Sequence, residues 1–149
     1  MKDLIVLKTT SSDISHFCNE IVSIGDFMYG TFRPRRPGDS LARPFTKRTI
    51  DDKLMGVSLY HTSEIVSTSL IDFFKENSVQ LGSKIAIMIE GDLLFRMKPR
   101  KIPMGQPLYV SHKGKPTWRK VGPRFGYAIT HQDKDGFLKV HVKPLISGG

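Results

Sequence analysis

The side chains of this sequence that could do chemistry are five histidines, fourteen carboxylates and one cysteine. Catalysis by such groups needs a nucleophile, a base or a metal cluster in a recognisable arrangement. The sequence contains no G-x-S-x-G, H-E-x-x-H or G-x-x-x-x-G-K-[ST] motif, and Gly122 and Gly126 do not form a dinucleotide fingerprint. We therefore expect no catalytic residue, no metal site and no cofactor, and we expect that the protein is not an enzyme.

Two of the histidines, His61 and His131, occupy equivalent places in an internal repeat. "GDFMYG" at 25–30 corresponds to "GQPLYV" at 105–110, and "GVSLYH" at 56–61 corresponds to "GYAITH" at 126–131. The repeat predicts two strand–loop–strand units in which a glycine opens a strand. Chance similarity between two hairpins is the alternative. A metal or acid–base role for the histidine pair is the less favoured interpretation, because no carboxylate recurs beside both rings to orient them.

A long segment of the second half is basic. Between Asp92 and Asp133 the sequence contains nine Lys or Arg residues and no acid: Arg96, Lys98, Arg100, Lys101, Lys113, Lys115, Arg119, Lys120 and Arg124. This segment must present a positive surface. Trp118 lies within it, and an aromatic side chain flanked by cations suits either stacking on a base or anchoring a protein interface.

A second basic segment, from Arg33 to Lys53, contains seven Lys or Arg residues and three prolines. Two interpretations stay open, a clamp on an acidic partner surface and a solvated loop. The candidate partner-contact residues of the whole chain are Arg33, Arg35, Arg36, Arg43, Arg48 and Trp118.

The elements that must position these side chains are short apolar runs bounded by Gly, Pro, Asp or Asn, which are typical of β-strands. At 149 residues and 39% hydrophobic content the chain fits one globular domain. We expect an all-β fold, a small β-barrel or β-sandwich of residues 20–149 that follows an extended N-terminal arm at residues 1–19. Residues 63–77 are consistent with one short helix or with a β-rich connection.

Two hairpins are predicted within this fold. In residues 83–97 the sequence "EGD" at 90–92 lies between two apolar runs, as a tight turn would. Further on, Asp135-Gly136 supplies residues suited to positive φ. The apolar residues that follow it alternate with polar ones, which indicates a strand with one buried face: Leu138, Val140 and Val142.

The formal net charge of +9 implies a partner rich in negative charge. Cys18 has no second cysteine with which to form a disulfide or a cysteine-based zinc cluster. The apolar run at residues 4–7 is too short for a signal-peptide core or a membrane span. We therefore expect a protein that is made and used in the cytoplasm, or in an assembly formed there.

An ordered series of these features resembles the structural cement, or capsid decoration, proteins of tailed bacteriophages. Over residues 21–144 the series is "GDFMYG", "MGVSLYH", "SKIAIMIEGDLLFRM", "GQPLYVSHKGKPT" and "RFGYAITHQDKDGFLKVHVKPL". The residues at the positions that characterise the family are Gly56, Val57, Gly91, Gly105, Tyr109, Gly114, Thr117, Gly126, Tyr127, Ala128 and residues 140–145. This chain is more basic than expected of the family, and its first loop is longer.

The resemblance implies a non-enzymatic protein that binds the outside of a phage head, bridges subunits of the major capsid protein and stabilises the virion shell. It implies self-association as a homotrimer, or alternatively a dimer, and no membrane partner. The N-terminal arm would then add a strand to a neighbour's sheet, and the basic loop would contact the shell. The alternative, with nucleic acid as the less expected partner, is a basic OB-like or SH3-like barrel that binds nucleic acid.

Overall fold

The computed structural model describes residues 4–30, 41–44, 52–63 and 78–144. Within these ranges the protein is all-β, as predicted, with eleven strands and no helix. The strands are β1 (Leu4–Phe17), β2 (Phe27–Gly30), β3 (Ala42–Pro44), β4 (Lys53–Ser58), β5 (His61–Ser63), β6 (Ser78–Gln80), β7 (Lys84–Arg96), β8 (Pro107–Val110), β9 (Pro116–Thr117), β10 (Arg124–Ala128) and β11 (Phe137–Val142). The possible helix lies largely in residues 64–77, outside the described part of the chain.

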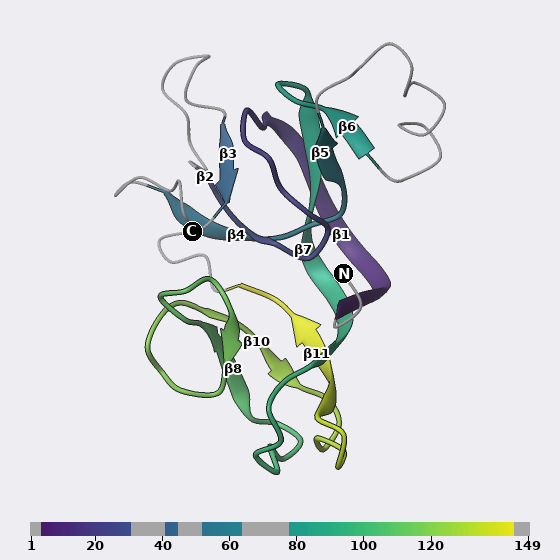
Figure 1. The fold of residues 1–149 in the computed structure, drawn as a ribbon, viewed down its shortest axis with the longest axis vertical. Coiled ribbons are helices and arrows are strands. Elements are labelled where there is room, and N and C mark those ends of the chain that lie inside the picture. Colours follow the sequence, from purple (N-terminus) through teal and green to yellow (C-terminus); the bar gives the residue numbers. More distant parts are fainter. Residues whose placement is uncertain (1–3, 31–40, 45–51, 64–77, 145–149) are drawn as a thin grey trace.

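Nine strands form one curled antiparallel sheet, while β5 and β6 form a separate parallel pair. The strand order is β3-β2-β4-β7-β11-β10-β8-β9, and β1 pairs with β7. The sheet curls into two lobes that lie one above the other in Figure 1. Lobe 1 contains β2, β3, β4, the first half of β7 and the second half of β1. Lobe 2 contains β8 to β11 and the second half of β7.

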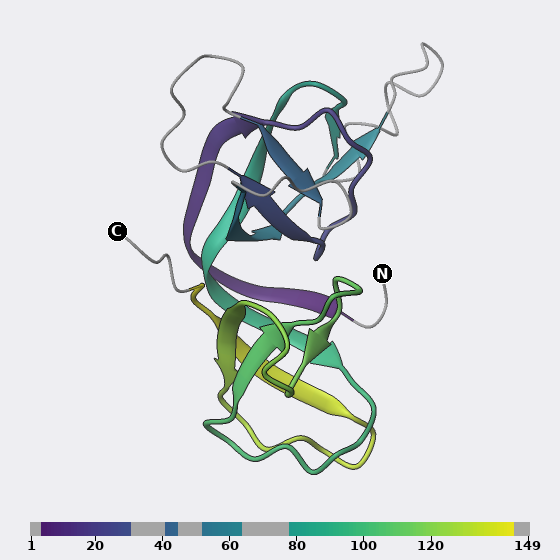
Figure 2. The same ribbon diagram turned by 90° about the vertical axis from the view of Figure 1, so that its left-hand side faces the viewer.

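β7 passes through both lobes as one continuous strand, so the hairpin predicted for residues 83–97 is wrong. Its first half pairs with β4 and its second half with β11. At Gly91, in the middle of the strand, an added Cβ would overlap the backbone carbonyl oxygen of Lys8 on β1. The glycine therefore permits a close approach of two strands and does not reverse the chain. Figures 1 and 2 show β1 beside β7 in both views.

The segment expected to be an extended arm is largely β1, and it pairs with β7 from its first residue to its last. Leu4 and Val6 pack against the main hydrophobic core, whereas Ile5 and Leu7, which alternate with them, are exposed. β1 is therefore part of this chain's own sheet. Its many Ser and Thr residues do not exclude a strand, because such residues suit a strand with one face in water.

The hairpin predicted at Asp135-Gly136 is confirmed. β10 and β11 are antiparallel, and Gly136 has a φ of 92°. The Asp133 carboxylate accepts the backbone N–H groups of Asp135 at 2.9 Å and Phe137 at 2.8 Å, which fixes the turn. The apolar residues of β11 alternate with partly buried ones and are themselves buried, as the pattern predicts.

The internal repeat is visible in the hydrogen bonds at the start of each lobe. Gly25 donates its N–H to the carbonyl oxygen of Ser58 at 2.9 Å, and Gly105 donates to that of Ala128 at 2.7 Å. Both glycines have positive φ, 95° and 91°. The turns that open β2 and β8 are thus equivalent.

The strands after these turns also have the same register. Met28 pairs with Gly56 in lobe 1, and Leu108 pairs with Gly126 in lobe 2. In each lobe the next pair, which contains the tyrosine of the repeat, is displaced by a β-bulge. At Gly56 and Gly126 an added Cβ would overlap a carbonyl oxygen of the neighbouring strand. The predicted equivalence of the two halves is confirmed, and chance similarity does not explain it.

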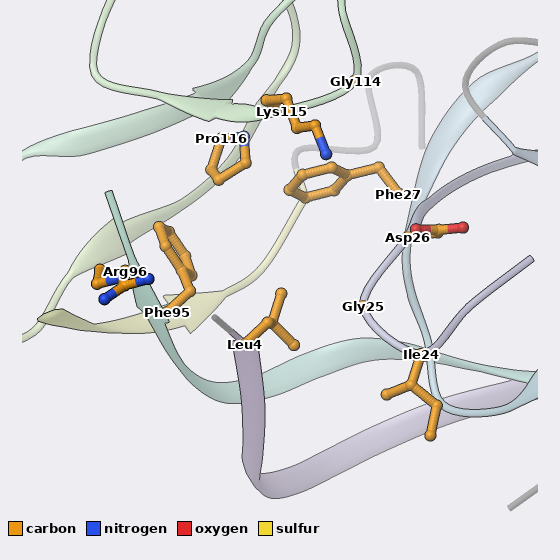
Figure 3. A pocket seen from close by; sticks show the side chains of 10 residues that line it. All are labelled: Leu4, Ile24, Gly25, Asp26, Phe27, Phe95, Arg96, Gly114, Lys115 and Pro116. Carbon is orange, nitrogen blue, oxygen red and sulfur yellow. The ribbon is translucent and has the colours of Figure 1, made fainter. Parts of the chain in front are cut away.

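The buried apolar side chains of the two lobes form two hydrophobic clusters. One fills lobe 1, and the other fills lobe 2 and reaches across to the facing surface of lobe 1. The Phe27 ring of β2 lies 4.8 Å from the Phe125 ring of β10. Beside this contact is a hollow of about 200 Å³, into which Leu4, Phe27 and Phe95 point from three different strands (Figure 3). The lobes therefore share part of one core.

Replacing Gly126 by Ala should destabilise the protein by about 1–3 kcal/mol, because the new Cβ would overlap the carbonyl oxygen of His141 and push β10 from β11. Gly105→Ala is the matched control. No atom lies within 4 Å of its added Cβ, so only the positive φ opposes the change, at about 1 kcal/mol. Urea unfolding followed by circular dichroism measures both values. A Gly126→Ala cost no larger than the control would contradict the close strand approach.

Two double variants test whether β1 belongs to the core. Leu4→Ser with Val6→Ser should lower the free energy of unfolding by about 2 kcal/mol or more, because both side chains pack against the main cluster. Ile5→Ser with Leu7→Ser should change it by less than about 1 kcal/mol, since these side chains are exposed. Thermal and urea unfolding of both variants provide the comparison. Equal, small effects would show that β1 is dispensable.

Candidate partner-binding surface

The structure describes two of the six candidate contact residues, Arg43 and Trp118. The other four lie in the ranges that the structure does not describe: Arg33, Arg35, Arg36 and Arg48. Their contact role stays a prediction.

Arg43, on β3, is part of a structural ion pair. Its Nη1 atom donates to both carboxylate oxygens of Asp52 at 2.9 Å. The Asp52 side chain is fully buried, and the Arg43 side chain is 22% exposed. A buried carboxylate needs such a charged donor, because its transfer out of water is costly. The Arg43 guanidinium therefore binds Asp52 of its own chain, and its contact with a partner stays a prediction.

Trp118 follows β9 in lobe 2 and is 39% exposed. It lies in an open groove of about 500 Å³. The guanidinium carbon of Arg119 is 5.5 Å from the centre of the indole ring, a cation–π contact. The turn after β9 is stabilised by the Thr117 hydroxyl, which accepts the backbone N–H of Arg119 at 3.2 Å.

Among the described residues, this groove is lined by Trp118, by no Asp or Glu and by five basic residues: Arg96, Lys98, Arg100, Lys115 and Arg119. We call this surface the cationic groove. All five come from the acid-free segment between Asp92 and Asp133. Eight of the nine basic residues of that segment are exposed, which confirms the predicted positive surface.

The wall of the cationic groove at residues 97–100 is held by Gln132, which the sequence did not indicate as a site residue. The Gln132 side-chain oxygen accepts the backbone N–H of Arg100 at 2.9 Å, and its amide nitrogen donates to the carbonyl oxygens of Met97 at 3.2 Å and Lys98 at 3.3 Å. Thr62, the equivalent residue of lobe 1, accepts the N–H of Val22 at 2.8 Å. The sequence does mark Thr62 and Gln132 as equivalent residues, since each directly follows a histidine of the repeat.

The opposite wall of the groove contains the turn between β8 and β9. Ser111 donates its N–H to the carbonyl oxygen of Lys115 at 2.8 Å, and its hydroxyl accepts the N–H groups of Lys113 and Lys115 at 3.3 and 3.2 Å. Gly114 completes the turn with a φ of 76°. These local bonds fix the position from which Lys115 enters the groove.

The repeated histidines have the same structural contact in both lobes. His61 Nδ1 accepts the backbone N–H of Ile24 at 3.3 Å, and His131 Nδ1 accepts that of Met104 at 3.1 Å. Each ring therefore supports the turn that precedes β2 or β8. This agrees with the favoured interpretation of a polar residue at a strand end.

Two further polar clusters were tested for catalytic geometry. Asp13 Oδ1 and Ser15 Oγ both lie 3.1 Å from the same atom, His16 Nδ1, whereas a catalytic triad places Ser and Asp on different ring nitrogens. Burial raises the pKa of Asp13, but hydrogen bonds from Ser15 and His16 outweigh it and lower the pKa below 3.8. This carboxylate therefore stabilises the fold above its ordinary pKa, and the contribution is lost as pH falls through the lower folded pKa.

The second cluster joins β7 and β11. His141 Nδ1 lies 2.8 Å from Asp92, and Nε2 lies 3.2 Å from Glu90, so both ring nitrogens have carboxylate partners.

Burial raises the pKa of the Cys18 thiol, which disfavours the reactive thiolate. Among the described residues no group of three or more His, Cys, Asp or Glu could hold a metal ion. The described part of the chain also contains no helix that is long and apolar enough to cross a membrane.

Arg43→Ala should lower the free energy of unfolding by about 3 kcal/mol or more, because it removes both hydrogen bonds from Nη1 to a buried carboxylate. Arg119→Ala is the control: it removes the same charge from an exposed position and should cost less than about 1 kcal/mol. Thermal unfolding separates the two. If Arg43→Ala were as stable as Arg119→Ala, the ion pair with Asp52 would not stabilise the fold.

The chain was compared with known proteins at the level of families and of single sequences. No protein-family model matches it, and no curated protein matches it either.

Proposed function

We propose that this protein is a non-enzymatic decoration, or cement, protein that binds an acidic area on the outside of a phage head and bridges major capsid subunits. The observation that carries this proposal is the cationic groove, whose described lining residues include five basic side chains, the sole tryptophan and no Asp or Glu. Such a surface favours an acidic partner.

The positions behind the resemblance to cement proteins support the proposal. Gly56 and Gly126 permit the same close strand approach in the two lobes, and Gly105 forms the turn before β8. Gly114 forms the turn beside the cationic groove. These four glycines of the resemblance are therefore positions that this fold requires.

A modest interface suffices for this function. A shell presents many copies of the same acidic area, and a protein that contacts neighbouring subunits benefits from the high effective concentration of the second contact. Binding then resists dissociation although each exposed charge pair contributes little.

Exposed apolar side chains support self-association, as a homotrimer or a dimer on the virion exterior. Ile5, Ile14 and Ile21 are 51%, 64% and 72% exposed, and all lie on or just after β1. Exposed apolar side chains contribute to protein–protein contacts when a partner covers them.

A charge-matched pair of variants tests the proposal. Lys98→Ser, Arg100→Ser, Lys115→Ser and Arg119→Ser together should lower occupancy on purified heads lacking this protein by about tenfold or more, because four contacts to the acidic area are lost. The control replaces four exposed lysines that do not line the groove: Lys53, Lys84, Lys134 and Lys143. Co-sedimentation at about 50 and about 500 mM salt is the measurement, since salt screens only the charged part of the interface.

Equal loss in the two variants would show that net charge alone matters and would remove the groove from the interface. A gel-shift assay with single-stranded DNA accompanies the sedimentation. Tight binding to DNA that vanishes at high salt, with no binding to heads, would overturn the decoration function in favour of nucleic-acid binding.

A further inference from the structure

We infer that the cationic groove accepts an extended acidic peptide segment that places one apolar side chain in a second hollow beside Trp118. This inference rests on the proposed function, because it names the element of the acidic partner that the groove would hold. It also gives Trp118 a specific role, as the wall between a charged and an apolar contact.

The second hollow adjoins the cationic groove. It has a volume of about 300 Å³ and is lined by Arg100, Ile102, Pro103, Gln106 and Trp118. Arg100 and Trp118 line both hollows. Ile102 belongs to the main core, so the floor of the hollow is fixed by packing. Counted over the described part of the chain, the hollow is lined by one Lys or Arg residue and the groove by five.

The basic side chains of the groove are available to an incoming acid. Lys98, Arg100, Lys115 and Arg119 are exposed and form no ion pair with another described residue. An extended peptide directs alternate side chains to opposite sides. Carboxylates on one side can then meet the basic residues while an apolar residue on the other side enters the second hollow. Burial of that residue would add binding energy that salt does not screen.

The same geometry disfavours single-stranded nucleic acid as the occupant. Such ligands bind by stacking successive bases on several aromatic side chains. Among the residues that the structure describes, Trp118 is the only Phe, Tyr or Trp that lines either hollow, and Arg119 already packs near its ring. The aliphatic walls of the second hollow, Ile102 and Pro103, suit a side chain such as Leu better than a base.

The only tryptophan of the chain reports occupancy of the groove directly by its fluorescence. The probes are an eight-residue peptide of Asp and Glu with one central Leu, the same peptide with Ser in place of Leu, a Gln-rich peptide with the same Leu, and oligothymidylate. We expect saturable binding of the acidic Leu peptide. The Ser peptide and the Gln-rich peptide should each bind at least about tenfold more weakly, since each lacks one of the two contacts.

Variants of the full chain locate the two contacts. Lys98→Ser with Lys115→Ser should weaken both acidic peptides, whereas Lys134→Ser with Lys143→Ser, which removes equal charge outside both hollows, should not. Gln106→Glu places a carboxylate in the second hollow, and it should weaken the Leu peptide about tenfold more than the Ser peptide. Circular dichroism confirms that every variant is folded.

The outcomes separate this inference from the proposed function. Equal binding of the Leu and Ser peptides, absence of binding by either, or tighter binding of oligothymidylate would each overturn the inference. If the protein still occupied heads in a groove-dependent manner, the proposed function would stand without it. Loss of both head binding and peptide binding would remove the proposed function as well.

Discussion

The backbone hydrogen bonds of β7 are the constraint on which both lobes depend. The first half of the strand pairs with β4 and the second half with β11, while β1 lies along both halves. The internal repeat makes the first half of β7, in lobe 1, equivalent to β11 in lobe 2. It makes the second half of β7, in lobe 2, equivalent to the second half of β1 in lobe 1. The boundary between the repeated units therefore falls inside a strand. The two lobes are therefore joined by one continuous strand.

Packing follows from this shared strand. Because β7 continues without a turn, the outer face of lobe 1 lies against the interior of lobe 2, and Phe27 reaches the aromatic side chains Phe95 and Phe125. The equivalent of Phe27 in lobe 2 is Pro107, which is only partly buried. The duplication is thus symmetric in its hydrogen bonds and asymmetric in its surfaces. The cationic groove of lobe 2 adjoins the hollow beside Phe27, because Arg96, Lys115 and Pro116 line both.

Local patterns predicted what depends on local chemistry. The matched glycine spacings identified the repeat, and the acid-free run identified the positive surface around Trp118. Gly91 was misread because a glycine between apolar runs looks the same at a turn and at a close strand contact; the difference is the carbonyl of Lys8, which is remote in sequence. In the sequence Arg43 is one of several basic residues of a predicted loop. Its hydrogen bond to Asp52, nine residues later, is evident only in the folded structure. Gln132 acts through bonds to a segment more than thirty residues earlier; its position after the repeated histidine marks it as the equivalent of Thr62 but does not identify these partners.

The ladder between β1 and β7 also has a mechanical consequence. It runs the length of both lobes, and its hydrogen bonds lie across the strand direction. A force that pulls β1 along β7 loads many of these bonds in shear at once, so that they must break together. Peeling the ladder from one end would break them one at a time and would need less force. β1 and β7 together therefore carry mechanical load between the two lobes.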